Sequence, residues 1–300
     1  MFKIAYSPIY QHPLPDGHRF PMLKYDLIPR QLVYQGIAKE QDFFEPSATK
    51  KDDILLTHDE NYYNQLLSQT LDASHIRRIG FPMSPQLIER ELILVQGTID
   101  CAYHALTDGV SMNVAGGTHH AFANKGEGFC LFNDMAVAAN VLLKNKSAQR
   151  ILIIDLDVHQ GNGTASIFKD EPRVFTFSMH GGDNYPFHKE HSDLDIPLKN
   201  GTEDNEYLLL LEKNLEIIFQ KHQPDFIFYL CGVDVLESDK LGKLKMSEKG
   251  CKKRDELVFS YCKQQKSPVA CAMGGGYSPK IGDIVNAHCQ TFEAAQHFFL

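Results

Sequence analysis

Two aspartates and a histidine stand at the polar end of an otherwise apolar stretch. Asp155, Asp157 and His159 follow the run Ile151–Ile154, whose β-branched residues predict a strand buried on both faces. Side chains two positions apart share one face of a strand, so the three converge on one point if the strand continues. Two carboxylates are costly to remove from water without a partner, and a metal ion is the simplest partner. The stretch alone equally fits a solvated strand end followed by a helix cap.

Polar groups also follow three other predicted strands. They are His119 and His120 after 111–115, Asp234 after 225–230, and Tyr277 after 268–272. Taken singly, each fits a surface pair, a turn residue or a packed ring. Ligands of parallel sheets bind beyond the carboxyl ends of the strands, so their joint occurrence predicts one common site.

The gathered side chains fit metal-assisted amide hydrolysis. Asp157, His159 and Asp234 make an open three-ligand zinc site with room for water and a substrate oxygen. The two carboxylates formally cancel the zinc charge, so its water is acidified less than under three imidazoles, and a histidine acting as general base becomes useful. Tyr277 would donate its hydroxyl hydrogen to the substrate carbonyl, opposite the metal.

The elements that must position these side chains alternate between strands and helices. The alternation predicts an α/β fold with a mostly parallel central sheet and helices on both faces, forming one catalytic domain over residues 1–300. Predicted strands lie at 2–6, 111–115, 151–155, 173–178, 225–230 and 268–272. Predicted helices lie at 59–68, 84–106, 134–144, 203–221, 247–264 and the C-terminus.

Local signals refine this outline. Ser84 is expected to cap helix 84–106, and Thr202 is expected to cap helix 203–221. A helix interrupted near Pro29 and a strand-like piece at 53–57 are also expected. The long loop 7–22, which carries His18 and Arg19, is expected at the surface.

Composition narrows the class of protein. The 300 residues are 43% hydrophobic and 23% charged, as in ordinary globular proteins. The net charge of −8, with no basic cluster beyond Lys252-Lys253-Arg254, argues against nucleic-acid binding. No apolar segment is long enough for a membrane span or a signal peptide. The seven cysteines lack a Cys-x-x-Cys spacing, so we expect reduced thiols, a cytoplasmic location and no cysteine ligation of zinc.

With these motifs in view, the sequence resembles the zinc-dependent histone deacetylase family of the arginase-deacetylase fold. The similar motifs are Gly117-Thr118-His119-His120, Gly128-Phe129-Cys130-Leu131-Phe132-Asn133-Asp134, Asp155-Leu156-Asp157-Val158-His159, Gly232-Val233-Asp234 and Gly274-Gly275-Gly276-Tyr277. Tyr6-Ser7-Pro8 and His18-Arg19 are also similar, so the resemblance covers nearly the whole chain.

The resemblance implies a role for each matching residue. One zinc ion per chain would be bound by Asp157, His159 and Asp234. The implied catalytic residues are His119, His120, Tyr277 and Asp155, with His120 nearer the acid-base role, Asp155 orienting His119 and Tyr277 polarising the acyl carbonyl. Potassium is implied near Asp155, Asp157, His159, Ser178 and Met179.

It also implies the substrate contacts. Gly128 and Phe129 would line a tunnel for the acyl-lysine, and the Gly128 carbonyl would meet the substrate amide. Arg19 would lie near an internal channel behind the metal, through which the carboxylate product leaves. Leu241 stands where polyamine deacylases of the family are expected to carry an acid, with Glu237 and Asp239 as substitutes.

Two departures from the family pattern bear on specificity. Gln160 and Asn162 replace a histidine and an acid, so His120 would be backed by a neutral amide; this run is similar to the class IV branch and its bacterial relatives. No tunnel-mouth aspartate is found near residues 80–83.

We therefore expect a zinc amidohydrolase that removes acetyl or longer acyl groups from lysine side chains of proteins or peptides. The alternatives are an acetylpolyamine or other small acyl-amine amidohydrolase and a catalytically silent module that binds acyl-lysine. An arginase-like dinuclear site is disfavoured because Gly232, not an aspartate, stands two residues before Asp234. The sequence leaves the oligomeric state and the choice between zinc and iron open.

Overall fold

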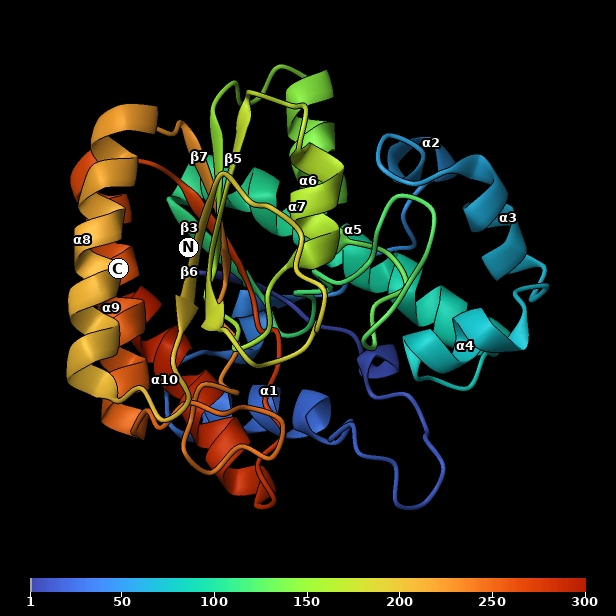
Figure 1. Ribbon diagram of the computed structural model, residues 1–300, viewed down its shortest axis with the longest axis horizontal. Coiled ribbons are helices and arrows are strands. Elements are labelled where there is room, and N and C mark those ends of the chain that lie inside the picture. The colour runs from blue at the N-terminus through green and yellow to red at the C-terminus, as the bar shows by residue number, and fades with distance from the viewer. Residues whose placement is uncertain (1) are drawn as a thin grey trace.

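A parallel β-sheet runs through the protein. A computed structural model describes residues 2–300 (Figure 1). Their eight strands are all parallel to their neighbours, in the order β2-β1-β3-β8-β7-β4-β5-β6. The strands are β1 (Lys3–Ala5), β2 (Phe43–Phe44), β3 (Val110–Asn113), β4 (Ile151–Asp155), β5 (Val174–Gly181), β6 (Leu194–Leu198), β7 (Phe226–Leu230) and β8 (Val269–Ala272).

Helices cover both faces of the sheet, because parallel strands need crossover connections. One layer contains α5, α6 and α7, and the opposite layer contains α1, α8, α9 and α10 (Figure 1). The helices are α1 (Lys24–Tyr34), α2 (Lys51–Ile54), α3 (Glu60–Leu67), α4 (Ala73–Ile79), α5 (Pro85–Asp108), α6 (Asp134–Lys144), α7 (Asn162–Phe168), α8 (Asp204–His222), α9 (Glu248–Gln265) and α10 (Ile281–Phe299). Within residues 2–300, no helix combines the length and apolarity needed to cross a bilayer.

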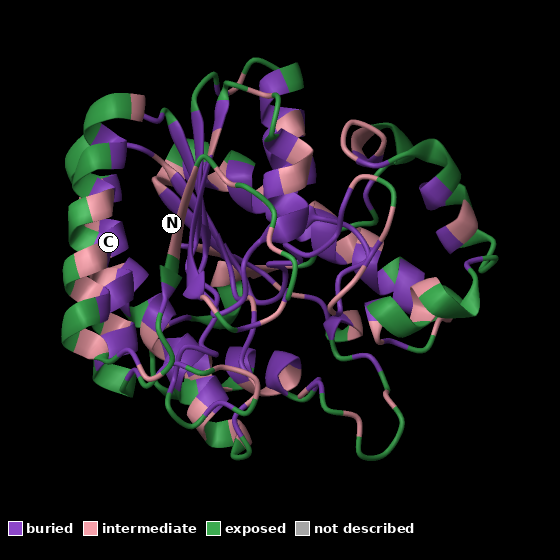
Figure 2. Cartoon of the chain, in the orientation of Figure 1, coloured by how far each residue is buried: buried purple, intermediate pink, exposed green. Residues whose placement is uncertain are grey.

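The four central strands carry the site. β3, β8, β7 and β4 are neighbours, and every one of their residues is buried (Figure 2). Apolar residues occupy both faces of these strands because helices cover both sides. The chain segments that follow the four strands therefore meet at one edge of the sheet, as the α/β prediction requires.

Several local predictions are confirmed. Helix α6 matches its predicted bounds, and α3, α5, α8, α9 and α10 lie within one or two residues of theirs or at the predicted end of the chain. Ser84 caps α5, since its side chain accepts a hydrogen bond from the Leu87 N–H. The apolar side chains Leu87, Leu94, Ile99 and Ala102, which recur at helical spacing, all lie on the buried face of α5.

Other predictions are wrong. β4 ends at Asp155, so Asp157 and His159 lie in the loop beyond it and not on a continued strand. α1 runs unbroken through Pro29, because its buried face is apolar on both sides of the proline.

The remaining errors concern short elements. Residues 51–54 form a helical turn that buries only Ile54, where a strand-like piece was expected. Glu203, not Thr202, is the N-cap residue of α8. Strand β6 escaped prediction because it is an edge strand with mostly half-exposed residues and a proline at position 197.

Candidate active site

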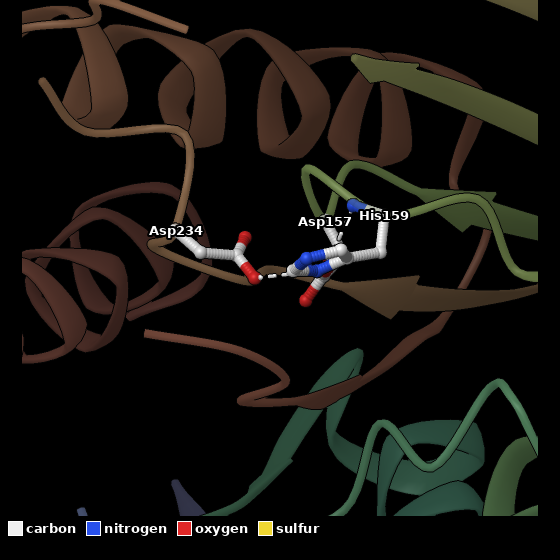
Figure 3. Close-up of side chains that lie close together, drawn as sticks. All are labelled: Asp157, His159 and Asp234. Carbon is white, nitrogen blue, oxygen red and sulfur yellow. Dashed lines mark hydrogen bonds and ion pairs between the residues drawn. The ribbon is translucent and has the colours of Figure 1, made fainter. Parts of the chain in front are cut away.

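An aspartate, a histidine and a second aspartate converge beyond the central strands. Asp157 and His159 follow β4, and Asp234 follows β7 (Figure 3). Their ligand atoms lie within 4.8 Å of one another, and all three residues are buried. His159 Nδ1 lies 3.0 Å from Asp157 Oδ1 and 3.1 Å from Asp234 Oδ2. The sequence predicted this grouping, and tertiary structure brings it together without the continued strand.

Backbone N–H groups aim the two carboxylates. Gly275 N–H donates to Asp157 Oδ2 at 2.8 Å, and Val158 N–H donates to Asp234 Oδ1 at 2.9 Å. The other oxygen of each carboxylate is left facing the imidazole. A Cβ on Gly275 would lie 2.0 Å from Asp234 Oδ2, so only glycine lets the backbone approach this closely.

The electrostatics of this group suit a cation. Burial opposes charging of His159, but its hydrogen bonds to Asp157 and Asp234 outweigh burial and raise the pKa of His159 to about 10. Burial and the charge of Asp157 raise the pKa of Asp234 to about 7. Two buried carboxylates thus face one imidazole, and a divalent ion with this donor set would neutralise them.

The paired histidines lie beside the triad with different partners. The His119 and His120 ring centroids are 4.1 Å apart. His119 Nδ1 lies 2.7 Å from Asp155 Oδ2, at the last residue of β4. Burial disfavours the charged ring, but Asp155 and then Asp157 outweigh it and raise the pKa of His119.

His120 is bound by an amide instead. Its Nδ1 lies 2.7 Å from Asn162 Oδ1, and Asn162 Nδ2 donates to Glu127 Oε1 at 2.7 Å. Because the carboxylate requires the amide nitrogen, the amide oxygen must face His120 and accept its Nδ1–H. The neutral ring then has an unprotonated Nε2. Burial, followed by the charges of His119 and His159, holds the pKa of His120 well below its usual value.

Asp134 holds the loop that carries the two histidines. Its carboxylate accepts from the Thr118 N–H at 2.8 Å, the Thr118 hydroxyl at 2.7 Å and the Gly117 N–H at 3.2 Å. Asp134 is the first residue of α6 and is fully buried. The sequence places Asp134 at the end of a family-like motif and the start of an apolar helix without a role, and its contacts with residues 16 positions away reveal that role.

An outer pocket of about 310 Å³ leads to these groups. His120, His159, Tyr277, Phe129 and Leu241 are among its lining residues. The Tyr277 ring is half-buried, and burial, with the charges of Asp157 and Asp234, raises its pKa well above the ordinary value. Its hydroxyl therefore stays protonated and able to donate.

The wall formed by Gly128 and Phe129 has a left-handed backbone. Their φ angles are 57° and 69°, and their N–H groups donate to the carbonyls of Arg78 and Ile79 at the end of α4. A Cβ on Gly128 would lie 2.6 Å from His120 Cδ2, so glycine is required on both steric and conformational grounds.

Arg19 lies at the mouth, which corrects its predicted position behind the metal site. Its guanidinium lies 4.9 Å from the Phe129 ring centroid, and it lines the outer pocket. A second cavity of about 40 Å³ lies deeper, and the cation that lines it is Arg90 of α5, bound to the Tyr10 carbonyl at 2.8 Å.

Lys24 is another buried cation that the sequence did not single out. Its Nζ donates to the Gly274 carbonyl at 2.8 Å. Burial lowers its pKa to about 8, although Asp234 and Asp157 favour the charged form. Lys24 is the first residue of α1, and from the sequence a lysine there is expected at the surface. Only the fold could show that it lies beside the site.

The two acids that might have replaced a rim acid do not lie on the rim. Asp239 accepts from the backbone N–H groups of Tyr277, Leu241 and Gly242, so its carboxylate orders the rim from inside. Glu237 lies 3.8 Å from Lys245 and does not line the outer pocket.

The chain is similar to proteins of one family. A family model described as the histone deacetylase domain matches residues 18–292. The chain is 43% identical over 298 residues to an uncharacterised protein from Picosynechococcus sp., with 99% of each chain covered. It is 34% identical over 277 residues to histone deacetylase 2 of Arabidopsis thaliana, covering 89% of this chain and 72% of that one.

Two solved structures have a similar fold. An HDAC homologue complexed with SAHA has a TM-score of 0.85 at 26% identity, over 99% of this chain and 84% of that one. An HDAC homologue from Aquifex aeolicus has a TM-score of 0.83 at 25% identity, over 98% of this chain and 84% of that one.

Proposed function

Because the chain belongs to the histone deacetylase family, we propose how its residues carry out the reaction and which substrates it accepts. It has the arginase-deacetylase fold and the hydrolytic lysine deacetylase activity of that family. The observation that carries the proposal is one pocket lined by His120, Tyr277 and His159, where His159 belongs to the buried group that also contains Asp157 and Asp234.

Asp157, His159 and Asp234 hold one zinc ion per chain. Two carboxylates and an imidazole nitrogen within 4.8 Å of one another support this assignment. The bound ion supplies Lewis-acid polarisation of the acyl carbonyl and lowers the pKa of a water molecule.

His120 acts as the general base and then as the general acid. Its unprotonated Nε2 takes a proton from the attacking water, and the same proton is delivered to the leaving lysine amine. The bond from Nδ1 to Asn162 supports this tautomer. His119, held by Asp155, orients the reactants beside it.

Two further groups bind the reacting amide. The Tyr277 hydroxyl donates to the oxygen that becomes negative in the transition state, supported by its protonated state and its place in the pocket. The Gly128 carbonyl accepts the substrate N–H, and Phe129 packs on the lysine methylenes.

A potassium ion beside Asp155 and the carbonyls of Asp157, His159 and Met179 is also proposed. Ser178, which would complete this group, lies opposite Asp155 in the register of β4 and β5. We further propose that residues 1–300 act as one catalytic domain in a reducing compartment such as the cytoplasm. The seven cysteines, all free and buried within residues 2–300, support that compartment.

The test uses an acetyl-lysine peptide with a fluorogenic leaving group and the zinc-loaded protein. We expect multiple-turnover hydrolysis, and its loss in Asp157→Asn with the fold retained by circular dichroism. Asp283→Asn, on the first turn of α10, is the matched control and should keep wild-type activity. Binding of the peptide without turnover would instead support a silent acyl-lysine-binding module.

A further inference from the structure

Positive charge surrounds the mouth of the active-site pocket. From it we propose that the enzyme selects acyl-lysines in acidic segments of proteins or peptides, an inference that rests on the proposed lysine deacylation. The determinants are Arg19, Arg78 and Lys243. Each comes from a different part of the chain: the loop before α1, the last turn of α4 and the loop after β7.

Contacts around the pocket place the three residues that carry these charges. Arg19 lies 4.9 Å from the ring centroid of Phe129, and the Arg78 carbonyl accepts the Gly128 N–H at 2.9 Å. Lys243 Nζ donates to the Asp183 carbonyl at 2.8 Å. The cations thus border the opening through which a substrate lysine must pass.

These charges are not neutralised by the protein. In the part of the chain that the structure describes, none of the three side chains forms an ion pair, and all three residues are exposed. Asp183 is the one acid among the described residues lining the outer pocket, and its Oδ2 accepts from Asn200 Nδ2 at 2.9 Å. Asp239, which precedes Lys243 in the sequence, does not line the pocket, and its carboxylate accepts hydrogen bonds from backbone N–H groups.

The charge at the mouth is opposite in sign to the net charge of the whole protein. The chain carries a net charge of −8, whereas the mouth carries three cations against one carboxylate. A cleft lined by one sign of charge concentrates its field and draws in ligands of the opposite sign. Here that favours carboxylates flanking the substrate lysine, since the lysine stem itself fills the tunnel.

The same field disfavours acylated polyamines. Such a substrate would place a distal ammonium beside Arg19, Arg78 and Lys243. The ammonium and these cations repel each other, and the apolar Leu241 offers the ammonium no compensating partner. Phe187, whose side chain is 84% exposed at the mouth, gives a peptide backbone an apolar surface that a small amine would not use.

The experiment compares three acetyl-lysine peptides that differ only in the flanking residues: aspartates, serines or lysines. We expect kcat/KM in the order aspartate, serine, lysine. Exposed ion pairs each change an affinity about 1.4- to 5-fold, so two such contacts predict roughly a 2- to 25-fold advantage of the acidic over the uncharged peptide. The advantage should shrink as salt rises from about 0.05 to about 0.5 M, because salt screens exposed charges.

The matched variants assign the effect to residues. The triple variant Arg19→Gln, Arg78→Gln, Lys243→Gln should bring the acidic-to-uncharged ratio close to one. Lys221→Gln removes one positive charge from the last turn of α8, next to the amino end of β7 and therefore away from the site, and should leave the ratio unchanged.

The possible outcomes distinguish failure of the preference for acidic segments from failure of the proposed lysine deacylation. If the uncharged peptide is hydrolysed but the acidic one has no advantage, or the basic one is better, the inference is wrong. An advantage that survives in the triple variant, or a preference for free Nε-acetyl-lysine or acetylspermidine over every peptide, also overturns it. Failure to hydrolyse any acetyl-lysine substrate overturns the proposed function instead.

Discussion

The bond between His120 and Asn162 allows the role of His120 to be tested through the pH dependence of the reaction. Replacing Asn162 by aspartate puts a carboxylate 2.7 Å from Nδ1, where the amide oxygen now lies. A nearby carboxylate favours the charged imidazole and raises its pKa. If His120 is the general base, the acidic limb of the kcat/KM profile must move to higher pH, since that limb reports its deprotonation in the free enzyme.

The size of this shift depends on Glu127. The wild-type amide nitrogen donates to Glu127 Oε1 at 2.7 Å, so Asn162→Asp would bring two carboxylates together. Two such groups share one proton, as paired carboxylates do, and only part of the new charge reaches His120. Opposite charges at this range shift a pKa by about 1 to 3 units. We therefore expect about one unit for Asn162→Asp, and about two to three for Asn162→Asp combined with Glu127→Gln.

The assay is kcat/KM for the uncharged acetyl-lysine peptide from about pH 4 to about pH 9, with zinc saturating, because the low pKa of His120 puts the acidic limb at low pH. Asn205→Asp, an exposed change in the first turn of α8, adds the same charge away from the site and is the control. An acidic limb that stays in place in both the single and the double variant would refute the assignment of His120 as the base. A larger shift in the single than in the double variant would refute the shared proton.

Three further substitutions test the other groups. Asp234→Ala should abolish tight binding of one divalent ion per chain and all activity; two ions per wild-type chain by metal analysis would contradict the mononuclear site. Tyr277→Phe should lower kcat by about 10²–10³, because it removes the hydroxyl that donates to the oxygen of the transition state. Zinc content and melting temperature should stay unchanged, because this hydroxyl has no hydrogen-bond partner among the described residues. A fall in kcat under about threefold would make Tyr277 a packing residue. Leu241→Glu should shift the kcat/KM ratio from acetyl-lysine peptides towards acetylspermidine, because it places a carboxylate in the pocket wall; an unchanged ratio would show that position 241 does not meet the substrate.

The sequence determined the sheet and the chemical types gathered at its edge. Strands β4 and β7 are apolar on both faces, a pattern typical of parallel strands covered by helices, and the alternation of strands with helices predicted the parallel fold. Asp157, Asp234 and Tyr277 each lie in the loop that follows such a strand, so their meeting at one edge could be inferred from topology alone.

Only the tertiary structure decided which groups support these residues and what surrounds the entrance. Asn162 donates a hydrogen bond to Glu127, 35 residues away in the sequence, and Lys24 donates one to the Gly274 carbonyl, 250 residues away. Asp239 looked like a rim acid in the sequence, but backbone N–H groups hold it inside. Arg19 lies at the mouth because its loop folds over the Phe129 ring. Local patterns report burial and periodicity, whereas these partners come from distant segments whose approach depends on packing of the whole chain.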